Sequence, residues 1–164
     1  MKKLILLVIG IITISCQTNP DLSLYQANKK VAEKFLLTYQ SPTNFDLFKS
    51  MIAENIVHQS PMYGAGEVGY DEAVGQGEFY MTGFENVKFT KAIWLPGVDE
   101  ETLLADGSVR VYGTWSGNSI ASGKEFSVDA YHYFMVKDGK ISKSGDYFDA
   151  TGMIMAIQPD PVVE

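Results

Sequence analysis

The sequence is poor in residues that form covalent cross-links and metal sites. Its 164 residues include one cysteine, Cys16, and two histidines, His58 and His132. A single cysteine cannot form a disulfide within the chain, so the fold must rest on its packed core alone. Two histidines without a cysteine cluster argue against a zinc site. Neither a metal ion nor a cofactor is therefore expected.

Positive charge is also scarce. The chain has 13 Lys and Arg against 20 Asp and Glu, which gives a formal net charge of −7. Loss of Lys2 and Lys3 with an N-terminal segment would remove two positive charges and change this value to −9. Such an acidic chain is repelled by nucleic-acid phosphates and by anionic lipid head groups. Nucleic acid is therefore not an expected partner, and attachment to a membrane would need an anchor.

The apolar run near the N-terminus is too short to cross a membrane. Leu4–Ile14 has 11 residues, whereas a spanning helix needs roughly 20. A short run after a basic start is typical of a secretory signal. The order Thr13-Ile14-Ser15-Cys16 resembles a bacterial lipobox, in which the cysteine becomes the lipidated first residue. The resemblance implies a signal peptide over residues 1–15, a tether over 16–21 and a bacterial envelope protein anchored through Cys16. An ordinary signal peptide with an incidental cysteine is the alternative.

Helical patterns come first in the rest of the chain. Apolar residues recur at helical spacing in LSLYQANKKVAEKFLLTY, and Ser23 and Gln26 have the spacing of a capping box. A short helix near the C-terminus is expected to be capped by Asp149. The predicted helices cover residues 22–39, 45–53, 70–84 and 150–157.

Strand patterns follow from Val87 onward, where apolar residues alternate with polar ones and β-branched and aromatic residues are common. The connections are short, which predicts an antiparallel sheet. The predicted strands cover residues 87–95, 109–116, 125–136 and 140–148, after a first short strand over 55–60. Together these patterns predict an α+β domain in which three N-terminal helices pack on one face of a strongly curved sheet.

The order of these elements resembles a known family. The residues that carry the resemblance are "ENIVHQSPMYGAG", then "GYDEAV" at the start of the third helix, then "FMVKDGKISKSGDYFDATGMIMAI". They are similar to the SnoaL-like branch of the nuclear transport factor 2-like superfamily, whose cone-shaped fold is shared with ketosteroid isomerase. The resemblance implies one domain over residues 22–158 with a cone-shaped cavity, followed by a tail over 159–164. It also implies a homodimer through the sheet as one arrangement.

The turn at Asp138-Gly139 decides whether His132 and Asp146 meet. In a two-residue turn, Asp146 lies on the opposite face of the sheet from His132. In a three-residue loop over 137–139, followed by a bulge, His132 lies opposite Ser144 and shares a face with Asp146. The residues alone leave both alternatives open.

The resemblance favours the shared face. In SnoaL-like polyketide cyclases, a histidine on the penultimate strand and an aspartate on the last strand line the cavity, and the aspartate is the acid/base. Counted from the "DGKI" turn, these positions match His132 and Asp146 here. A carboxylate in an apolar pocket can move the proton of an enolising ketone, and an imidazole can stabilise the oxyanion. This chain departs from the cyclases at Gly145, where an aromatic residue is common.

Other residues are expected at the cavity wall because an apolar cone with a few polar groups suits a small hydrophobic ligand. The candidates are one histidine and seven aromatic residues: His58, Tyr63, Tyr80, Trp94, Tyr112, Trp115, Phe134 and Phe148. Three functions remain open. The first is a lipoprotein whose cone binds a small, largely apolar molecule. The second is an acid/base enzyme, an isomerase or a polyketide-cyclase-like protein using Asp146 with His132. The third is a dimerising interaction domain with a filled cone.

Overall fold

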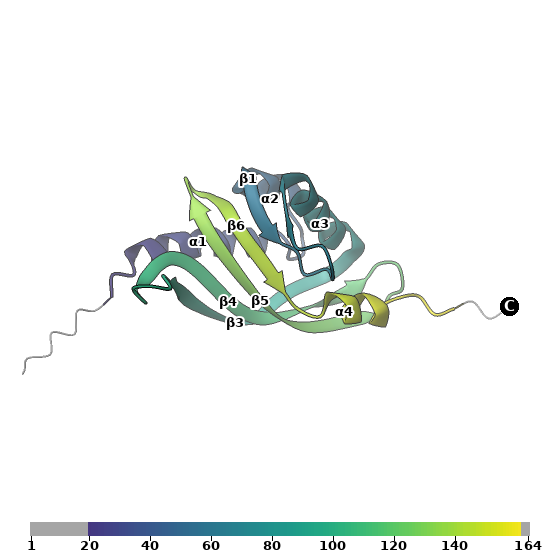
Figure 1. Cartoon of the computed structure of the whole chain (residues 1–164). Coiled ribbons are helices and arrows are strands. Elements are labelled where there is room, and N and C mark those ends of the chain that lie inside the picture. Colours follow the sequence, from purple (N-terminus) through teal and green to yellow (C-terminus); the bar gives the residue numbers. More distant parts are fainter. Residues whose placement is uncertain (1–19, 162–164) are drawn as a thin grey trace, which may run out of the picture.

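The computed structural model describes residues 20–161 of the chain. The predicted signal peptide, the lipidation site Cys16 and most of the predicted tether lie outside the described residues, as do residues 162–164 of the predicted tail. Within the described range no helix is both long and apolar enough to cross a membrane. The two ends of this range lie at opposite ends of the molecule (Figure 1).

The described residues form an α+β domain with a curved sheet, as predicted. Its helices are α1 (Ser23–Leu37), α2 (Phe45–Met51), α3 (Tyr70–Gly83) and α4 (Ala150–Ala156). Its strands are β1 (Ile52–Gln59), β2 (Glu67–Val68), β3 (Phe84–Val98), β4 (Ala105–Ser119), β5 (Glu125–Lys137) and β6 (Lys140–Tyr147). Helices α1, α2 and α3 cover one face of the sheet, and α4 lies near the ends of β5 and β6 (Figure 1).

The six strands lie in the order β2-β1-β6-β5-β4-β3. All neighbouring pairs are antiparallel except β1 and β6, which run parallel. The parallel pair differs from the antiparallel sheet that the short connections predicted. It is allowed because β1 and β6 are separated by most of the domain, whereas a tight turn can join only antiparallel strands.

Strands β3 and β4 extend three or four residues beyond the predicted strands at both ends. Pro96 lies inside β3, which is the last strand at one edge of the sheet. A proline is tolerated there because an edge strand has one side without strand partners. Pairing between β3 and β4 also shifts register at several points, and such irregularities increase the bend of a sheet.

The start of α1 also differs from the prediction. The helix begins at Ser23, so Ser23 lies inside the helix and its side chain does not cap the N-terminus. The Asp21 carboxylate instead accepts a hydrogen bond from the Ser23 backbone N–H at 2.9 Å. The capping box of Ser23 and Gln26 is therefore wrong, because an aspartate two residues upstream satisfies the first backbone donor. The predicted cap at Asp149 is confirmed: its carboxylate accepts the Gly152 N–H at 2.8 Å.

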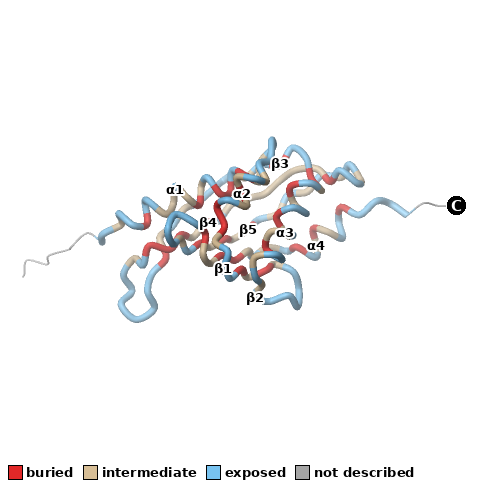
Figure 2. The backbone as a smooth tube through the Cα atoms, turned by 90° about the horizontal axis from the view of Figure 1, so that it is seen from above, coloured by how far each residue is buried: buried red, intermediate tan, exposed pale blue. Residues whose placement is uncertain are grey.

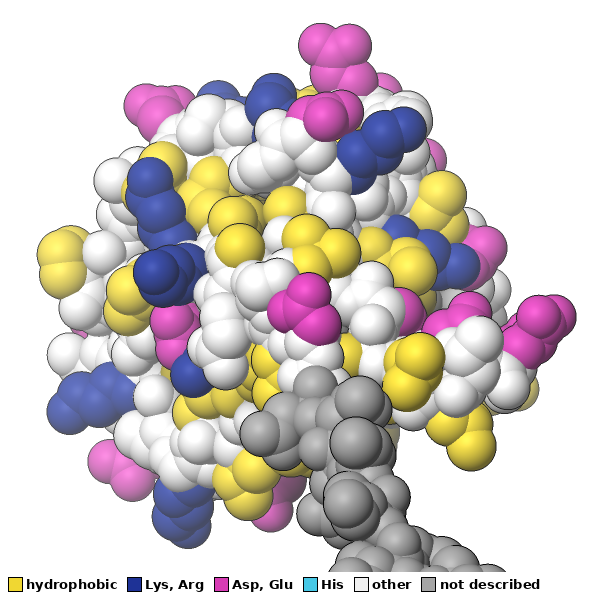
Figure 3. Space-filling model, turned by 90° about the vertical axis from the view of Figure 1, so that its left-hand side faces the viewer, with side chains coloured by type: hydrophobic (Ala, Val, Ile, Leu, Met, Phe, Trp, Pro, Cys, Tyr) yellow, Lys and Arg dark blue, Asp and Glu magenta, His cyan; other side chains and the backbone are white. Residues whose placement is uncertain are grey.

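The core lies between the helices and the inner face of the sheet. Buried positions gather in the middle of the molecule, while the loops at its ends are exposed (Figure 2). Phe35 of α1, Phe48 of α2 and Phe134 of β5 meet there, with ring centroids 5.2 to 5.7 Å apart for the contacts that Phe35 makes. On the end of the molecule from which the N-terminal residues leave, acidic, basic and apolar side chains alternate, and no histidine is visible on that face (Figure 3).

Candidate functional site

A cavity lies between the three N-terminal helices and the inner face of the sheet. Its volume is about 80 Å³, measured as the space open to the centre of a water-sized sphere. This space is larger than a single water needs, so the cavity can take a small molecule. Most lining residues are aliphatic or aromatic, and the polar ones among the described residues are His58, Gln76, His132, Ser144 and Asp146, with the hydroxyls of Tyr39 and Tyr80.

The hairpin between β5 and β6 brings His132 and Asp146 together. Its turn has two residues, Asp138 and Gly139, with φ of 52° and 74°, as expected for a type I′ turn. The register then shifts by one residue, because Ser142 is an extra residue on β6. Beyond this bulge His132 pairs directly with Asp146. The turn therefore has two residues, as in the first alternative, but His132 and Asp146 share a face, as in the second. Both hold because the bulge lies at Ser142 on β6 and not next to the turn.

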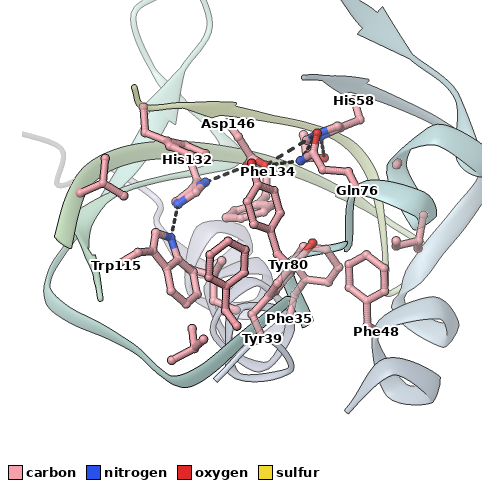
Figure 4. Close-up of a pocket in the computed structure, with 18 of the residues that line it drawn as sticks. Phe35, Tyr39, Phe48, His58, Gln76, Tyr80, Trp115, His132, Phe134 and Asp146 are labelled. Carbon is pink, nitrogen blue, oxygen red and sulfur yellow. Dashed lines mark hydrogen bonds and ion pairs between the residues drawn. The ribbon is translucent and has the colours of Figure 1, made fainter. Parts of the chain in front are cut away.

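The predicted pairing of His132 with Ser144 is therefore wrong, since Ser144 lies opposite Phe134 on β5. Ser144 instead meets His58 across the parallel pair of β1 and β6. The Nδ1 atom of His58 is 2.9 Å from the Ser144 hydroxyl oxygen. This contact places both histidines of the chain on the same side of the cavity (Figure 4).

Asp146 is the centre of the polar group (Figure 4). One carboxylate oxygen accepts a hydrogen bond from His132 Nδ1 at 2.7 Å. The other accepts one from Gln76 Nε2 at 2.9 Å and lies 3.6 Å from His58 Nε2. The network therefore joins β5, β6, β1 and α3 through a single carboxylate.

The partners of the two histidines define their protonation. The indole N–H of Trp115 can only donate, and it lies 2.8 Å from His132 Nε2, so this nitrogen is an acceptor and the His132 proton is on Nδ1. Gln76 Nε2 lies 3.0 Å from His58 Nε2. If the amide were turned over, its oxygen would face the Asp146 carboxylate and repel it. His58 Nε2 therefore accepts from Gln76, and its Nδ1 donates to Ser144. Both imidazoles are neutral in this arrangement.

The carboxyl group of Asp146 is ionised at neutral pH. Burial is the largest effect on its pKa and raises it. The positive charge that His132 and His58 would carry if protonated, together with the hydrogen bonds from His132 and Gln76, lowers the pKa below its ordinary value. The apolar pocket therefore does not raise the pKa of Asp146 toward neutrality, and the group is available as a base.

The hydroxyl groups of two tyrosines are the remaining polar groups of the lining. Burial raises the pKa of Tyr39 and of Tyr80, and the negative charge of Asp146 raises both further. Both groups are therefore neutral phenols that can donate a hydrogen bond at physiological pH. Tyr39 lies two residues after the end of α1, and Tyr80 lies one turn after Gln76 on α3.

Five of the eight predicted wall residues line the cavity: His58, Tyr80, Trp115, Phe134 and Phe148. The other three do not. Trp94 packs against the core from β3, with the Lys29 ammonium 5.7 Å from its ring. Tyr63 lies in the loop after β1 and is 99% exposed. Tyr112 lies on the opposite face of the sheet, because its strand neighbour Val111 points into the core and adjacent side chains alternate between faces.

Gln76 and Tyr39 are polar lining residues that the sequence did not indicate, and Gln76 is the one that donates a hydrogen bond to Asp146. The buried residues of α3 are Ala73, Gly77 and Met81, which follow one another at intervals of four. Gln76 and Tyr80 lie on the adjacent line of the same helix and face the cavity. A polar side chain beside the apolar stripe of an amphipathic helix was the signal that could have found it.

Gly145 shows why an aromatic residue is absent before Asp146. A Cβ atom at this position would lie 2.3 Å from a ring carbon of Tyr133. Tyr133 is the direct cross-strand partner of Gly145, and its ring fills the space that a side chain at 145 would need. The Tyr133 ring of β5 therefore occupies the space on the outer face that an aromatic residue at position 145 would take.

Among residues 20–161, no group of three or more His, Cys, Asp or Glu side chains could hold a metal ion. The oxygen and nitrogen atoms around Asp146 instead bind one another. The arrangement can hold a ligand against a carboxylate, or use that carboxylate as a base.

No protein-family model and no curated protein matches this sequence. Solved structures share its fold. An isomerase candidate from Bacillus subtilis is 14% identical with a TM-score of 0.67, and the match covers 82% of this chain and 99% of that chain. A polyketide cyclase candidate from Xanthomonas campestris pv. campestris is 15% identical with a TM-score of 0.65, and the match covers 83% and 100%.

A third structure comes from Catenulispora acidiphila, a protein with a ketosteroid isomerase-like fold in complex with trimethylamine. It is 16% identical, with a TM-score of 0.59, and the match covers 80% of this chain and 94% of that chain. At such identities the likeness shows the fold. The cone-shaped fold expected from the sequence is confirmed.

Proposed function

We propose that this chain, which has the cone fold of the nuclear transport factor 2-like superfamily, binds a small, largely apolar molecule in its cavity. The observation that carries the proposal is a cavity of about 80 Å³ with a mostly apolar lining and one polar side. An apolar ligand is stabilised when it leaves water and contacts such a lining. Asp146, Tyr39 and Tyr80 offer polar contacts that fix its orientation. The trimethylamine held by the Catenulispora protein supports a ligand of this size.

The two tryptophans of the chain supply the test. Trp115 lines the cavity and Trp94 does not, so the NMR signal of the Trp115 indole N–H should shift when a ligand enters, while the Trp94 signal should stay. We would titrate the protein with cyclohexanol, 3,3-dimethylbutan-1-ol and trimethylamine. Val128 also lines the cavity, and Val128→Phe should reduce the shift by filling part of the space. If no probe moves the Trp115 signal, the binding proposal is wrong.

An acid/base enzyme is the second candidate, and one observation favours it: the Asp146 carboxylate is held by two hydrogen bonds and faces the cavity. As an ionised group it would act as the base that removes a proton next to a carbonyl. His132 would position this base, since both of its ring nitrogens are already bonded. Hydrogen exchange of cyclohexanone in deuterated water tests this candidate. Wild-type protein should accelerate the exchange and Asp146→Asn should not.

A protein-interaction role is the third candidate, and the outer face of the sheet favours it. Tyr112, Tyr131 and Tyr147 form a row across β4, β5 and β6, with ring centroids 4.9 and 5.6 Å apart. Ile93 and Leu95 are exposed on β3. We propose that a second copy covers this face. Sedimentation over a range of concentrations should show a dimer that Tyr131→Lys disrupts. A monomer at all concentrations would refute the dimer.

We also propose that the protein is attached to a membrane of the bacterial envelope through a lipid on Cys16. The support is the N-terminal sequence alone, with its basic start, short apolar run and lone cysteine. Labelling of cells with a radioactive fatty acid should mark the wild-type protein and leave Cys16→Ala unlabelled. Equal labelling of both proteins would refute the anchor.

A further inference from the structure

The charge of the cavity lining is not balanced. Among the described lining residues there is no lysine or arginine, and Asp146 is the one acidic side chain. Both histidines are neutral in their observed hydrogen bonds, because Trp115 donates to one and Gln76 to the other. Tyr39 and Tyr80 are neutral phenols. The cavity lining therefore carries one negative charge without a positive partner among the described residues.

Such a charge attracts a cation strongly in an apolar site. Opposite charges interact more strongly in a low-dielectric environment than in water. Asp146 accepts one hydrogen bond from His132 and one from Gln76, one on each carboxylate oxygen. Each oxygen therefore keeps a further lone pair for a ligand. A cation that enters the cone would compensate the charge directly.

The opposite side of the cavity suits a particular kind of cation. Trp115, Tyr39 and Tyr80 present their rings toward the same space as the Asp146 carboxylate (Figure 4). The face of an aromatic ring attracts a cation, and tryptophan and tyrosine do so more strongly than phenylalanine. Alkyl groups on the cation would also bury apolar area against these rings. A hydrated metal ion would lose its oxygen ligands against such a wall.

We propose that the ligand of this cone is a small organic cation, an alkylated ammonium compound whose positive nitrogen lies beside the Asp146 carboxylate and whose alkyl groups pack on Tyr39, Tyr80 and Trp115. This inference rests on the proposed binding function and names the class of its ligand. The cavity volume of about 80 Å³ suits a compact ammonium compound.

Choline and 3,3-dimethylbutan-1-ol test the inference, because they have the same shape and differ in the charge of one central atom. Both would be titrated into the full chain by calorimetry, with the Trp115 indole signal as a second readout. We expect choline to bind at least tenfold more tightly than the neutral alcohol. Asp146→Asn should reduce this preference to less than threefold, since the amide keeps the size of the side chain and removes its charge.

Asp129→Asn is the matched control. Asp129 is an exposed carboxylate on the same strand as His132, bonded to the Thr114 hydroxyl at 2.7 Å and not part of the cavity lining. It changes the net charge by the same amount, so the preference for choline should stay unchanged. If Asp129→Asn removed the preference as well, a general charge effect would explain the data and the inference would be wrong.

The outcomes separate this inference from the binding proposal. If the neutral alcohol binds as tightly as choline or more tightly, the ammonium inference is wrong and the binding proposal stands. If neither compound binds and the Trp115 signal does not move, both are wrong at this ligand size. If Asp146→Asn fails to fold, as judged by circular dichroism, the wild-type preference decides by itself, because the two probes differ only in charge.

Discussion

Gly75 and Gly77 lie two residues apart in α3 and should respond in opposite ways to the same substitution. At Gly75 an added Cβ meets nothing within 4 Å, whereas at Gly77 it would lie 2.3 and 2.5 Å from two ring carbons of Phe48. Alanine is about 0.8–1.0 kcal/mol better than glycine inside a helix. Gly75→Ala should therefore stabilise the protein by nearly that amount.

Gly77→Ala adds an overpacking cost to the same gain. Phe48 is 1% exposed, and its ring is held by Phe35 and Tyr39 with centroids 5.2 and 5.1 Å away, so it cannot turn aside freely. Forcing a methyl group into such a core costs about 1–3 kcal/mol. The net effect of Gly77→Ala should be a loss of up to about 2 kcal/mol, and the two variants should differ by about 1–3 kcal/mol.

Urea unfolding of both variants, followed by far-ultraviolet circular dichroism, measures the two free energies of unfolding. The comparison controls for helix propensity, since residue type and helix are the same. If Gly77→Ala were as stable as Gly75→Ala, the close packing of α3 on Phe48 would be wrong. The position of Gln76 between the two glycines would then also need revision.

Three further changes test the polar group and its surroundings. Trp115→Phe removes the donor to His132 Nε2, so it should destabilise the protein by about 1–3 kcal/mol in urea unfolding. Trp94→Phe should cost less, because Trp94 makes no such hydrogen bond. Equal losses of stability would contradict the hydrogen bond between Trp115 and His132. Because the folded-state pKa of Asp146 is lowered, its stabilising effect is present above the unfolded-chain value of about 3.9 and is lost as the pH falls through the folded-state pKa. The stability difference between wild type and Asp146→Asn should therefore shrink on acidification below about pH 4, and a difference that stays constant in urea titrations from pH 6 to 3 would refute this. Asp149→Ala removes the cap of α4 and should cost about 1 kcal/mol, with faster amide exchange in α4; unchanged exchange would show that the cap is not needed.

The fold could be predicted from the sequence because its elements are strongly patterned. The alternation of apolar residues from Val87 onward and the helical stripe before it are properties of single segments, and these segments appear in the structure with shifted ends. Pairing between distant segments was not predictable in this way. Nothing in the pattern of β1 indicated that it would run parallel to β6, since that contact depends on the whole curved sheet.

The site shows the same limit at the level of single residues. The sequence locates a turn at Asp138-Gly139 but leaves its length open, and the extra residue Ser142 that moves His132 opposite Asp146 has no local signature. Aromatic character alone suggests that Tyr112 lines the cavity, whereas strand parity puts it on the outer face. The apolar stripe of α3 indicates which side of the helix is buried but does not indicate that Gln76 beside it faces the cavity.

The parallel pair of β1 and β6 makes the site depend on both halves of the chain. His58 and Ser144 are 86 residues apart in sequence and 2.9 Å apart in space. During synthesis, helices α1 to α3 and β1 leave the ribosome long before β6. Contacts across such long separations form late because closing the loop costs entropy. A nascent chain that lacks β6 has neither Asp146 nor the strand that holds His58, so the cavity becomes able to recognise a ligand only when the last strand is in place. Ligand binding would then act on completed chains alone and stabilise them by mass action.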